Sequence, residues 1–196
     1  PGQASLLHVA TGGGKTRIAN DLLVRWLEAK RSSGPVLWIT KDWRLLLQAM
    51  RDLCQRHGFA NRVGAIGGLR TPLHPIANTQ RDVNYTTLHT LRRRVEQGWP
   101  AALGPKPSLI VWDECHWGEQ GPTGKQVFQL AKANKIGLLG LTATPRVNSS
   151  HFETIFSKDY AALVADGYLA RHRLHDPVRT DVQWRPNVTK GGFDIS

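Results

Sequence analysis

The segment VATGGGKT at residues 9–16 constrains the fold of this chain more than any other stretch. A short apolar run over residues 6–10 leads into it, and the residues after it carry apolar side chains at helical spacing. A strand, a glycine-rich loop that ends in Lys-Thr and then a helix is the layout of a phosphate-binding loop. The strict pattern has a glycine where this chain has Val9. An ordinary glycine-rich turn before a helix is the alternative interpretation.

The loop predicts a site for a nucleotide and Mg²⁺. Consecutive glycines let backbone N–H groups point inward toward an anion, and the following helix N-terminus adds positive partial charge there. Lys15 is expected to reach the β- and γ-phosphates, and the Thr16 hydroxyl is expected to ligate Mg²⁺. The predicted nucleotide-binding residues are Thr11, Gly12, Gly13, Gly14, Lys15 and Thr16.

A second candidate site begins where another apolar run ends. Four apolar residues at 109–112 lead into Asp113 and Glu114. Asp113 is expected to hold Mg²⁺ together with Thr16, and Glu114 is expected to orient and deprotonate the attacking water. Phosphoryl transfer needs positioned charge, so the predicted catalytic residues are Lys15, Asp113 and Glu114. An acidic pair that caps a helix is the alternative interpretation.

Apolar runs alternate with amphipathic segments along the chain. The clearest apolar runs lie at residues 36–40, 63–66, 108–112 and 136–141, and we expect helices between them. The alternation predicts an α/β fold with a doubly wound, mainly parallel sheet and helices on both faces. Because ligands bind beyond the carboxyl ends of such strands, the glycine loop and Asp113 should share one cleft.

Local signals predict where the individual elements begin and end. Asp42 is expected to cap a helix that stops near Gly58. The run at residues 136–141 is the last clear strand. We further expect helices at residues 86–96, 126–133 and 159–169, an edge strand at 171–175 and a loop-like tail from residue 180.

The charge of the chain points to a polyanionic partner. Lys and Arg total 26 against 15 Asp and Glu, a formal net charge of +11. Nucleic acid is favoured and no membrane is expected, because the sequence shows no basic amphipathic helix with a lipid-facing side and no run of about 18 apolar residues. Two cysteines, Cys54 and Cys115, form neither a disulfide framework nor a metal-ligand spacing, which predicts a reducing, cytoplasmic location. A merely basic, solvated surface is the alternative.

Three motifs in this order resemble those of the first RecA-like domain of superfamily 2 helicases and translocases. They are VATGGGKT, DECH at residues 113–116 and LTATP at residues 141–145. The branch that they resemble contains type III restriction motor subunits and DEAD/DEAH-like repair helicases, and it tolerates a residue such as Val9 in place of glycine. The resemblance covers residues 6–147. It implies a RecA-like P-loop NTPase that uses ATP and Mg²⁺ and moves on nucleic acid, with DNA favoured over RNA.

The resemblance also implies roles for residues outside the glycine loop and the acidic pair. Thr142 and Thr144 belong to the motif that couples nucleotide state to strand binding, and His116 is a candidate relay in that coupling. A hydrogen-bonded structural histidine is the alternative for His116. The predicted nucleic-acid contacts, which lie near the same strand ends, are Lys41, Arg44, Gly67, Gly68, Arg70, Thr86 and Thr87.

Two parts of such a motor are not evident in the sequence. Gln3 is too close to Lys15 to be the adenine-recognising glutamine of the family, and the second RecA-like domain with its arginine finger is missing. We therefore expect a RecA-like domain at residues 1–170, a lead-out segment at 171–196 and little ATP hydrolysis by the chain alone. The alternatives are a restriction-enzyme subunit that translocates on duplex without unwinding it, a small-molecule P-loop kinase, and a basic DNA-binding module with vestigial nucleotide chemistry.

Overall fold

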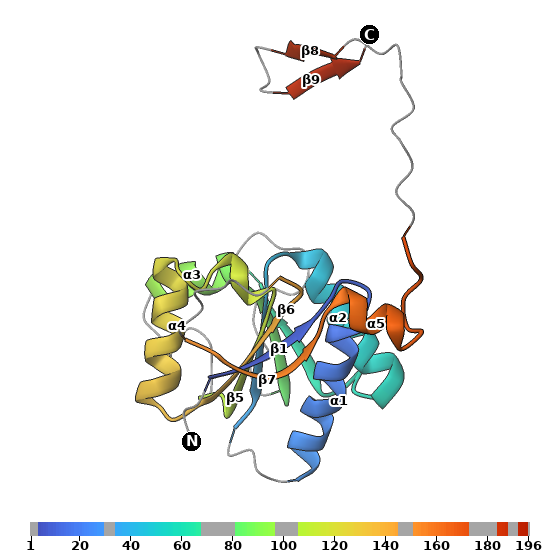
Figure 1. Cartoon of the computed structure of the whole chain (residues 1–196). Helices are drawn as coiled ribbons and strands as arrows, with labels where there is room; N and C mark the ends of the chain where they lie inside the picture. The colour runs from blue at the N-terminus through green and yellow to red at the C-terminus, as the bar shows by residue number, and fades with distance from the viewer. Residues whose placement is uncertain are drawn as a thin grey trace.

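The computed structural model describes residues 4–29, 34–67, 81–96, 106–144, 151–172, 184–187 and 192–195. Seven strands form one parallel sheet in the order β3-β4-β2-β5-β6-β1-β7 (Figure 1). These strands are β1 (Ala4–Val9), β2 (Val36–Thr40), β3 (Val63–Ile66), β4 (Val83–Thr87), β5 (Leu109–Asp113), β6 (Gly137–Thr142) and β7 (Glu153–Lys158). The predicted parallel α/β sheet is therefore confirmed.

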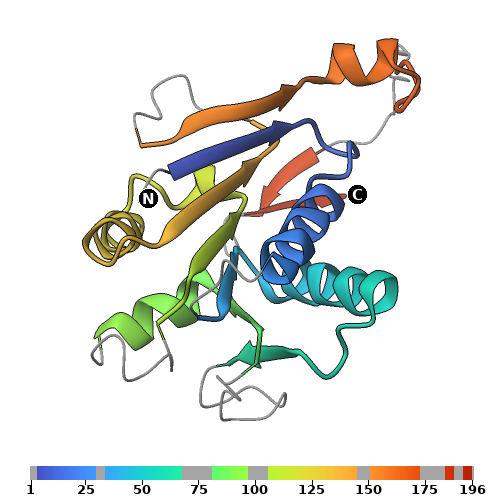
Figure 2. The same ribbon diagram turned by 90° about the horizontal axis from the view of Figure 1, so that it is seen from below.

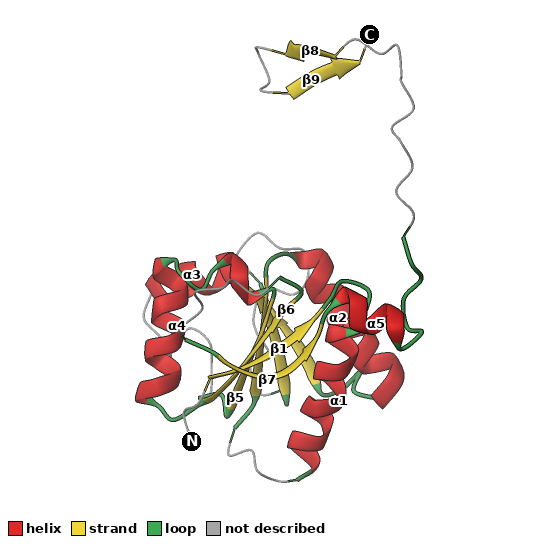
Figure 3. Cartoon of the chain, in the orientation of Figure 1, coloured by secondary structure: helices red, strands yellow, loops and turns green. Residues whose placement is uncertain are grey.

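Helices cover both faces of the sheet. They are α1 (Lys15–Glu28), α2 (Trp43–His57), α3 (Leu88–Glu96), α4 (Pro122–Ala133), α5 (Tyr160–Ala165) and the short 3₁₀ helix η1 (Cys115–Trp117). Figure 2 shows α1 and α2 on one side of the sheet and α3 and α4 on the other, and Figure 3 shows the same layers by type of element. Among the described helices, none combines the length and the apolar character that a membrane span requires.

Side chains of the central strands alternate between two hydrophobic cores, because the sheet is covered on both faces. All five residues of β2 are buried. Trp38 belongs to the core shared with α1 and α2, whereas Leu37 and Ile39 belong to the core shared with α3 and α4. Trp38 also stacks on Tyr85 of the adjacent β4, with ring centroids 5.5 Å apart. With both faces occupied, the strand ends are where polar side chains can gather.

The predicted cap of α2 is confirmed and positions basic residues at a strand end. The Asp42 carboxylate accepts the backbone N–H of Arg44 at 2.9 Å and that of Leu45 at 3.1 Å. Gly58 ends the helix in the left-handed conformation, with φ of +69°. This cap sets the direction in which the chain leaves β2, and so it places Lys41 and Arg44 beside the carboxyl end of that strand.

Two predicted helix starts are wrong. β4 continues through Thr87 and α3 begins at Leu88, not at residue 86. The β-branched threonines complete the strand, and the Thr87 hydroxyl accepts the N–H of Thr90 at 3.2 Å where the helix starts. α4 begins at Pro122, earlier than the predicted start at residue 126, because proline suits the first turn of a helix.

The sheet edge and the tail also differ from the predictions. β7 is a further strand after residues 136–141, and its mostly exposed residues lack the apolar run that marks the buried strands. α5 ends at Ala165, before the predicted limit, because Gly167 turns the chain with φ of +75°. The tail expected to be a loop contains the antiparallel pair β8 (Trp184–Asn187) and β9 (Gly192–Ile195). Residues 171–172 have no regular secondary structure, and the rest of that predicted edge strand lies outside the described residues.

Candidate nucleotide-binding site

The glycine loop after β1 is tightly constrained. Gly12 and Gly14 both have φ of +84°, a left-handed conformation that glycine adopts without the steric cost of a side chain. Packing confines Gly13, since a Cβ at this position would lie 2.5 Å from Leu163 Cδ1 and 2.6 Å from Val9 Cγ1. The loop leads directly into α1, so backbone N–H groups at the helix N-terminus lie beside it. The arrangement suits an anion.

Lys15 and Glu114 join the two predicted motifs. The Lys15 Nζ atom lies 3.2 Å from Glu114 Oε1, and both side chains are largely buried. The contact runs from the carboxyl end of β1 to that of β5, with β6 between them in the sheet. This ion pair confirms that the glycine loop and the acidic pair lie side by side at one edge of the sheet.

Asp113 is a buried acid at the end of β5. It is only 4% exposed, and its Oδ1 atom accepts the backbone N–H of Glu114 at 3.0 Å. The pKa of Asp113 is raised to about 6, mainly by burial and next by the negative charge of Glu114, while the charge of Lys15 opposes the rise. An ionised Asp113 would therefore gain from a bound cation.

The oxygen donors at this position suit Mg²⁺. The Thr16 hydroxyl and the Asp113 carboxylate are hard ligands of the kind that Mg²⁺ prefers. Within the described ranges, no group of three or more His, Cys, Asp or Glu side chains is placed to hold a metal ion by itself. Mg²⁺ at this position would depend on phosphate oxygens and water for its other ligands, as it commonly does in phosphoryl-transfer sites.

His116 connects the ends of β5 and β6. Its Nδ1 atom lies 2.9 Å from Thr142 Oγ1 and 3.4 Å from Glu114 Oε2. Thr142 Oγ1 also accepts the backbone N–H of Thr144 at 3.1 Å. Glu114 has φ of +51°, which costs a non-glycine residue about 1–2 kcal/mol, so its surroundings must hold it in place. One imidazole thus links the acidic pair to the third motif.

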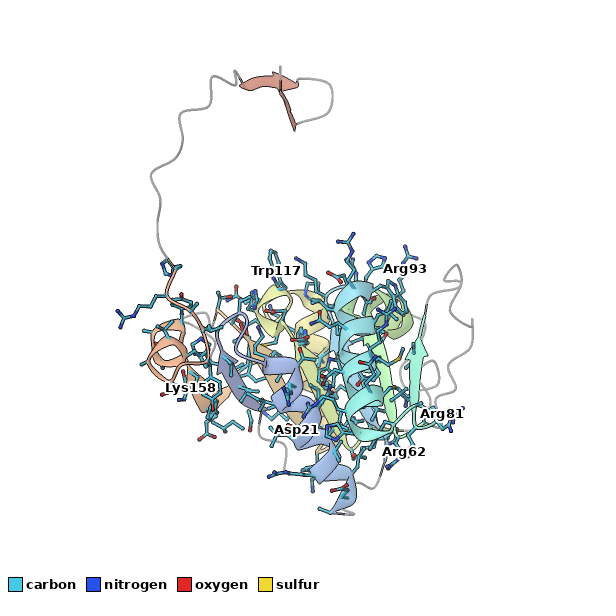
Figure 4. All side chains as sticks on the ribbon, turned by 90° about the vertical axis from the view of Figure 1, so that its right-hand side faces the viewer. Asp21, Arg62, Arg81, Arg93, Trp117 and Lys158 are labelled. Atoms are coloured by element: carbon cyan, nitrogen blue, oxygen red, sulfur yellow. The ribbon has the colours of Figure 1, made fainter. Side chains whose placement is uncertain are left out.

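Two of the predicted nucleic-acid contacts are exposed at a strand end. Lys41 and Arg44 lie beside the carboxyl end of β2, and Lys41 Nζ is 3.6 Å from the ring centroid of Trp117, itself exposed. Figure 4 shows Trp117 at the same end of the molecule as Arg93 of α3, whereas Arg62 lies at the opposite end. Basic side chains from α2 and α3 therefore share the end that carries the nucleotide-site motifs.

The other predicted contacts are buried or lie elsewhere. The Thr86 hydroxyl donates to the Ile66 carbonyl at 3.3 Å, and Thr87 bonds within the start of α3. Gly67 is also buried. A strand that touches these residues would have to contact their backbone, or the structure would have to rearrange. The remaining two predicted contacts, Gly68 and Arg70, lie outside the described residues.

The sequence predicts a helix at residues 159–169 but does not indicate that the segment from β7 to α5 supports the glycine loop. The carbonyl of Lys158, at the end of β7, accepts the N–H of Ala10 at 3.0 Å, and Leu163 of α5 packs on Gly13. A cavity of about 590 Å³ lies between this segment and the loop. The signal available in the sequence was Asp159, which caps α5 by accepting the N–H of Ala162 at 2.8 Å.

His8 of β1 is a second residue that the sequence did not single out. Its Nδ1 atom lies 2.8 Å from Ser157 Oγ, and its Nε2 atom lies 3.2 Å from the carbonyl oxygen of Ala143. Because a carbonyl can only accept, Nε2 carries the proton. His8 thus joins the strand before the glycine loop to the third motif and to β7. The sequence signal that could have indicated a role for His8 is its position as a polar residue inside an apolar run.

Comparison with known families agrees with the three motifs. The family described as type III restriction enzyme, Res subunit, matches residues 2–147. This chain belongs to that family. The match includes all three motifs of the Res-family domain, so the resemblance seen in the sequence is confirmed. Comparison with curated protein sequences finds no match.

Solved structures show the same fold. The UvsW helicase of bacteriophage T4 is 20% identical with a TM-score of 0.61, over 80% of this chain and 54% of its own. The Hef helicase domain of Pyrococcus furiosus is 20% identical with a TM-score of 0.62, over 87% and 38%. The type ISP restriction-modification enzyme LlaGI, bound to a DNA substrate mimic, is 17% identical with a TM-score of 0.56, over 85% and 19%. The Res-family domain therefore has a RecA-like helicase fold. The chain spans about half the length of UvsW and a smaller share of Hef and LlaGI.

Proposed function

We propose that this Res-family domain binds ATP with Mg²⁺ and hydrolyses it as part of a motor that moves on DNA. The observation that carries the proposal is the 3.2 Å contact between Lys15 Nζ and Glu114 Oε1, beside the buried Asp113. Two motifs far apart in the chain thereby supply one cation and two carboxylates within a small space. Positioned charge of this kind is what phosphoryl transfer requires.

The glycine loop is the proposed phosphate site. Backbone N–H groups of residues 11–16 and the N-terminus of α1 attract anions. Lys15 would exchange its contact with Glu114 for the β- and γ-phosphates of the nucleotide. That exchange would leave the Glu114 carboxylate available to orient the attacking water. In the nucleotide-free protein, the ion pair with Lys15 holds Glu114 away from that role.

Thr16 and Asp113 are the residues that would hold the metal. When bound, Mg²⁺ neutralises negative charge on the phosphates. Next to that charge the Asp113 carboxyl would be ionised, although burial raises its pKa to about 6 in the free protein. A hydroxyl and a carboxylate together provide the hard oxygen donors that this role needs.

His116, Thr142 and Thr144 are the proposed coupling residues. His116 contacts both Glu114 and Thr142, and Thr142 bonds to the backbone of Thr144. Any shift of Glu114 on nucleotide binding would therefore change the contacts at the end of β6. The carboxyl ends of β2 and β6 lie on the same edge of the sheet as Lys41, so such a change could reach a bound strand.

DNA is the proposed track. The net charge of +11 and the exposed Lys41 and Arg44 at the strand ends support a polyanionic partner. DNA is favoured over RNA because the family is that of a restriction enzyme and because the LlaGI structure contains a DNA substrate mimic. Additional candidate contacts are Gly67, Gly68, Arg70, Thr86 and Thr87.

A second RecA-like domain is the proposed partner of this one in the intact protein. UvsW, Hef and LlaGI are all longer than the region that matches this chain. The second domain would add an arginine to the nucleotide site, so the chain alone is proposed to be nearly inactive. The limits 1–170 for the domain and 171–196 for the lead-out segment stay predictions, as does a cytoplasmic location, which suits the free Cys54 and Cys115.

Translocation on duplex without strand separation is a second candidate function. The family match to a restriction-enzyme subunit favours it over unwinding. Strand displacement and triplex displacement assays on the intact protein separate the two, because a translocase displaces a triplex-forming strand without opening the duplex.

Calorimetry with Mg²⁺-ATP tests the nucleotide site directly. Lys15→Ala should weaken binding about tenfold or more, since it removes a charge-assisted contact with the phosphates. Lys125→Ala, at an exposed lysine of α4, is the matched control and should bind like the wild type. Equal affinities for wild type and Lys15→Ala would remove the assignment.

A further inference from the structure

A cavity of about 590 Å³ opens beside the glycine loop, on the side of β7 and α5. Its volume lies within the range of small-molecule sites, roughly 300–1,000 Å³. It is continuous with the loop that we propose for the phosphates, because the loop glycines form part of its wall. The lining residues are Val9, Gly12, Gly13, Gly14, Arg17, Ile18, Phe156, Lys158, Leu163 and Tyr168.

The wall of this cavity combines aromatic rings with cations. Phe156 and Tyr168 are 43% and 76% exposed, so each ring has a free face. Arg17 lies one turn into α1 at the same opening, and Lys158 is paired with Asp166. The described lining includes no Asp, Glu, Asn or Gln side chain. Such a wall attracts a flat, electron-rich ring that is joined to negatively charged groups.

Hydrogen bonds and packing hold this wall against the loop. Beyond the end of α5 at Ala165, the chain turns at Gly167, and the N–H of Tyr168 donates to the Leu163 carbonyl at 2.9 Å. The same Leu163 packs on Gly13, and a Cβ on Gly12 would lie 3.2 Å from Leu169 Cδ2. The backbone at Tyr168 is thus held beside the glycine loop by residues on either side of it.

The segment after Tyr168 is anchored as well. The Tyr160 hydroxyl donates to the Ala170 carbonyl at 2.6 Å and accepts the N–H of His172 at 3.0 Å. Because Tyr160 is the first residue of α5, the chain is tied at both ends of this short helix. Because the backbone that carries Tyr168 is already held in place, little backbone freedom is lost on binding, which favours affinity.

We propose that this cavity is the subsite for the nucleoside of the bound nucleotide, with the base stacked on Tyr168 and supported by Phe156. The inference rests on the proposed function, since it needs the phosphates to lie at the glycine loop. It assigns base binding to β7 and to the turn after α5, none of which the sequence pointed to. Stacking tolerates every base because each has a π-face, and no described lining side chain could accept a hydrogen bond from the adenine amino group except through a tyrosine hydroxyl. Because stacking is the main base contact in this proposal, the subsite accepts adenine and guanine nucleotides with little preference between them.

Three probes separate the subsite from the phosphate loop: Mg²⁺-ADP, Mg²⁺-GDP and inorganic tripolyphosphate, each measured by calorimetry on the whole chain. Tyr168→Ala should weaken ADP and GDP about tenfold each, the loss of one stacked base, and should leave tripolyphosphate unchanged within about twofold. Tyr168→Phe keeps the ring and should restore nucleotide affinity. Ile155→Ala is the matched control, because this exposed residue lies on β7 next to Phe156 but does not line the cavity.

Each outcome decides one question. If Tyr168→Ala weakens nucleotides and tripolyphosphate equally, the residue only supports the loop and the subsite is wrong. If Tyr168→Ala changes neither the nucleotide affinity nor the tripolyphosphate affinity while Lys15→Ala weakens both affinities, the subsite is wrong and the phosphate assignment stands. If Lys15→Ala changes neither, the proposed function itself fails. A strong preference for ADP over GDP in the wild type would overturn the proposed base indifference.

Discussion

The Nδ1 atom of His116 lies 2.9 Å from the hydroxyl oxygen of Thr142, which joins the acidic motif after β5 to the third motif after β6. Thr142 is 1% exposed, and the same hydroxyl oxygen accepts the N–H of Thr144. If the Thr142 hydroxyl were removed, His116 and the backbone N–H of Thr144 would each lose a hydrogen-bond partner in a place that water hardly reaches. The contact is therefore important for stability as well as for the proposed coupling.

Thr142→Val should destabilise the chain by about 1–3 kcal/mol, because valine keeps the shape of threonine but leaves buried polar groups unpaired. Urea denaturation followed by circular dichroism measures the change. Thr123→Val is the control: Thr123 is 7% exposed, and within the described residues its hydroxyl makes no hydrogen bond. An equal loss in both variants would show that the His116 contact adds nothing to stability.

Asp113→Asn should stabilise the metal-free chain near neutral pH. The pKa of Asp113 is raised to about 6 in the folded state, above its ordinary value of 3.8, so the folded protein binds this proton more tightly than the unfolded chain. Stability due to this group is thus greatest at low pH and is lost as pH rises from about 4 to about 6. The asparagine variant avoids that loss, by an amount on the order of 2 kcal/mol above pH 6.

Urea denaturation in the presence of a chelator measures this effect at pH 4.5 and at pH 7.5. The difference in unfolding free energy between Asp113→Asn and wild type should be small at the lower pH and favour asparagine at the higher. Asp159→Asn is a poor control because Asp159 caps α5, so Glu153→Gln, an exposed acid on β7, is preferred. A pH-independent difference for Asp113→Asn would mean that the pKa of Asp113 is not raised in the folded protein.

The buried part of the fold and the contact between the glycine loop and the acidic pair could be predicted from the sequence for one physical reason. A parallel strand covered on both faces must be apolar along its length, as β2 and β5 are, and the glycine loop and Asp113 follow such runs directly. Once the strands are assigned, parallel topology brings their carboxyl ends together. The Lys15 and Glu114 contact then needs no information beyond the motifs.

The edge of the sheet could not be predicted in this way. β7 is exposed along most of its length, so it carries no continuous apolar run, and its role depends on the contact of Lys158 with Ala10, which lies far away in sequence. The Thr86 prediction shows the opposite limit. Its sequence position near the strand end suggested an exposed contact, but the strand continued through it and buried its hydroxyl against Ile66. The exposure of a residue depends on where its strand or helix ends, and here the strand ends two residues later than predicted.

The chain alone should hydrolyse ATP near the background rate, even with DNA present. A transition-state arginine can increase the rate by roughly 10³–10⁵, and in our proposal it comes from a second RecA-like domain. Phosphate release from Mg²⁺-ATP, measured with Glu114→Gln as the blank, tests this. Robust DNA-stimulated hydrolysis by residues 1–196 would show that the nucleotide site is complete without another domain.

DNA should contact the end of the molecule that carries the proposed nucleotide site. Lys41 and Arg44 are exposed there, beside the carboxyl end of β2. A motor must ignore sequence, so its contacts should be mainly to phosphates, and removing two of them should lower the slope of log affinity against log salt by about 2. Fluorescence anisotropy with a short labelled duplex, titrated at several salt concentrations, gives this slope for wild type and for the Lys41→Ala and Arg44→Ala double variant.

The matched control removes the same charge from the other end of the sheet. Arg25 and Lys132 are exposed in the last turns of α1 and α4, helices that lead back to the amino ends of strands. Their double alanine variant lowers the net charge by two, as the first variant does, but should leave the salt slope nearly unchanged. A generic basic surface would respond to total charge alone. If both double variants lose affinity and slope equally, the localised DNA contact is wrong and only non-specific attraction remains.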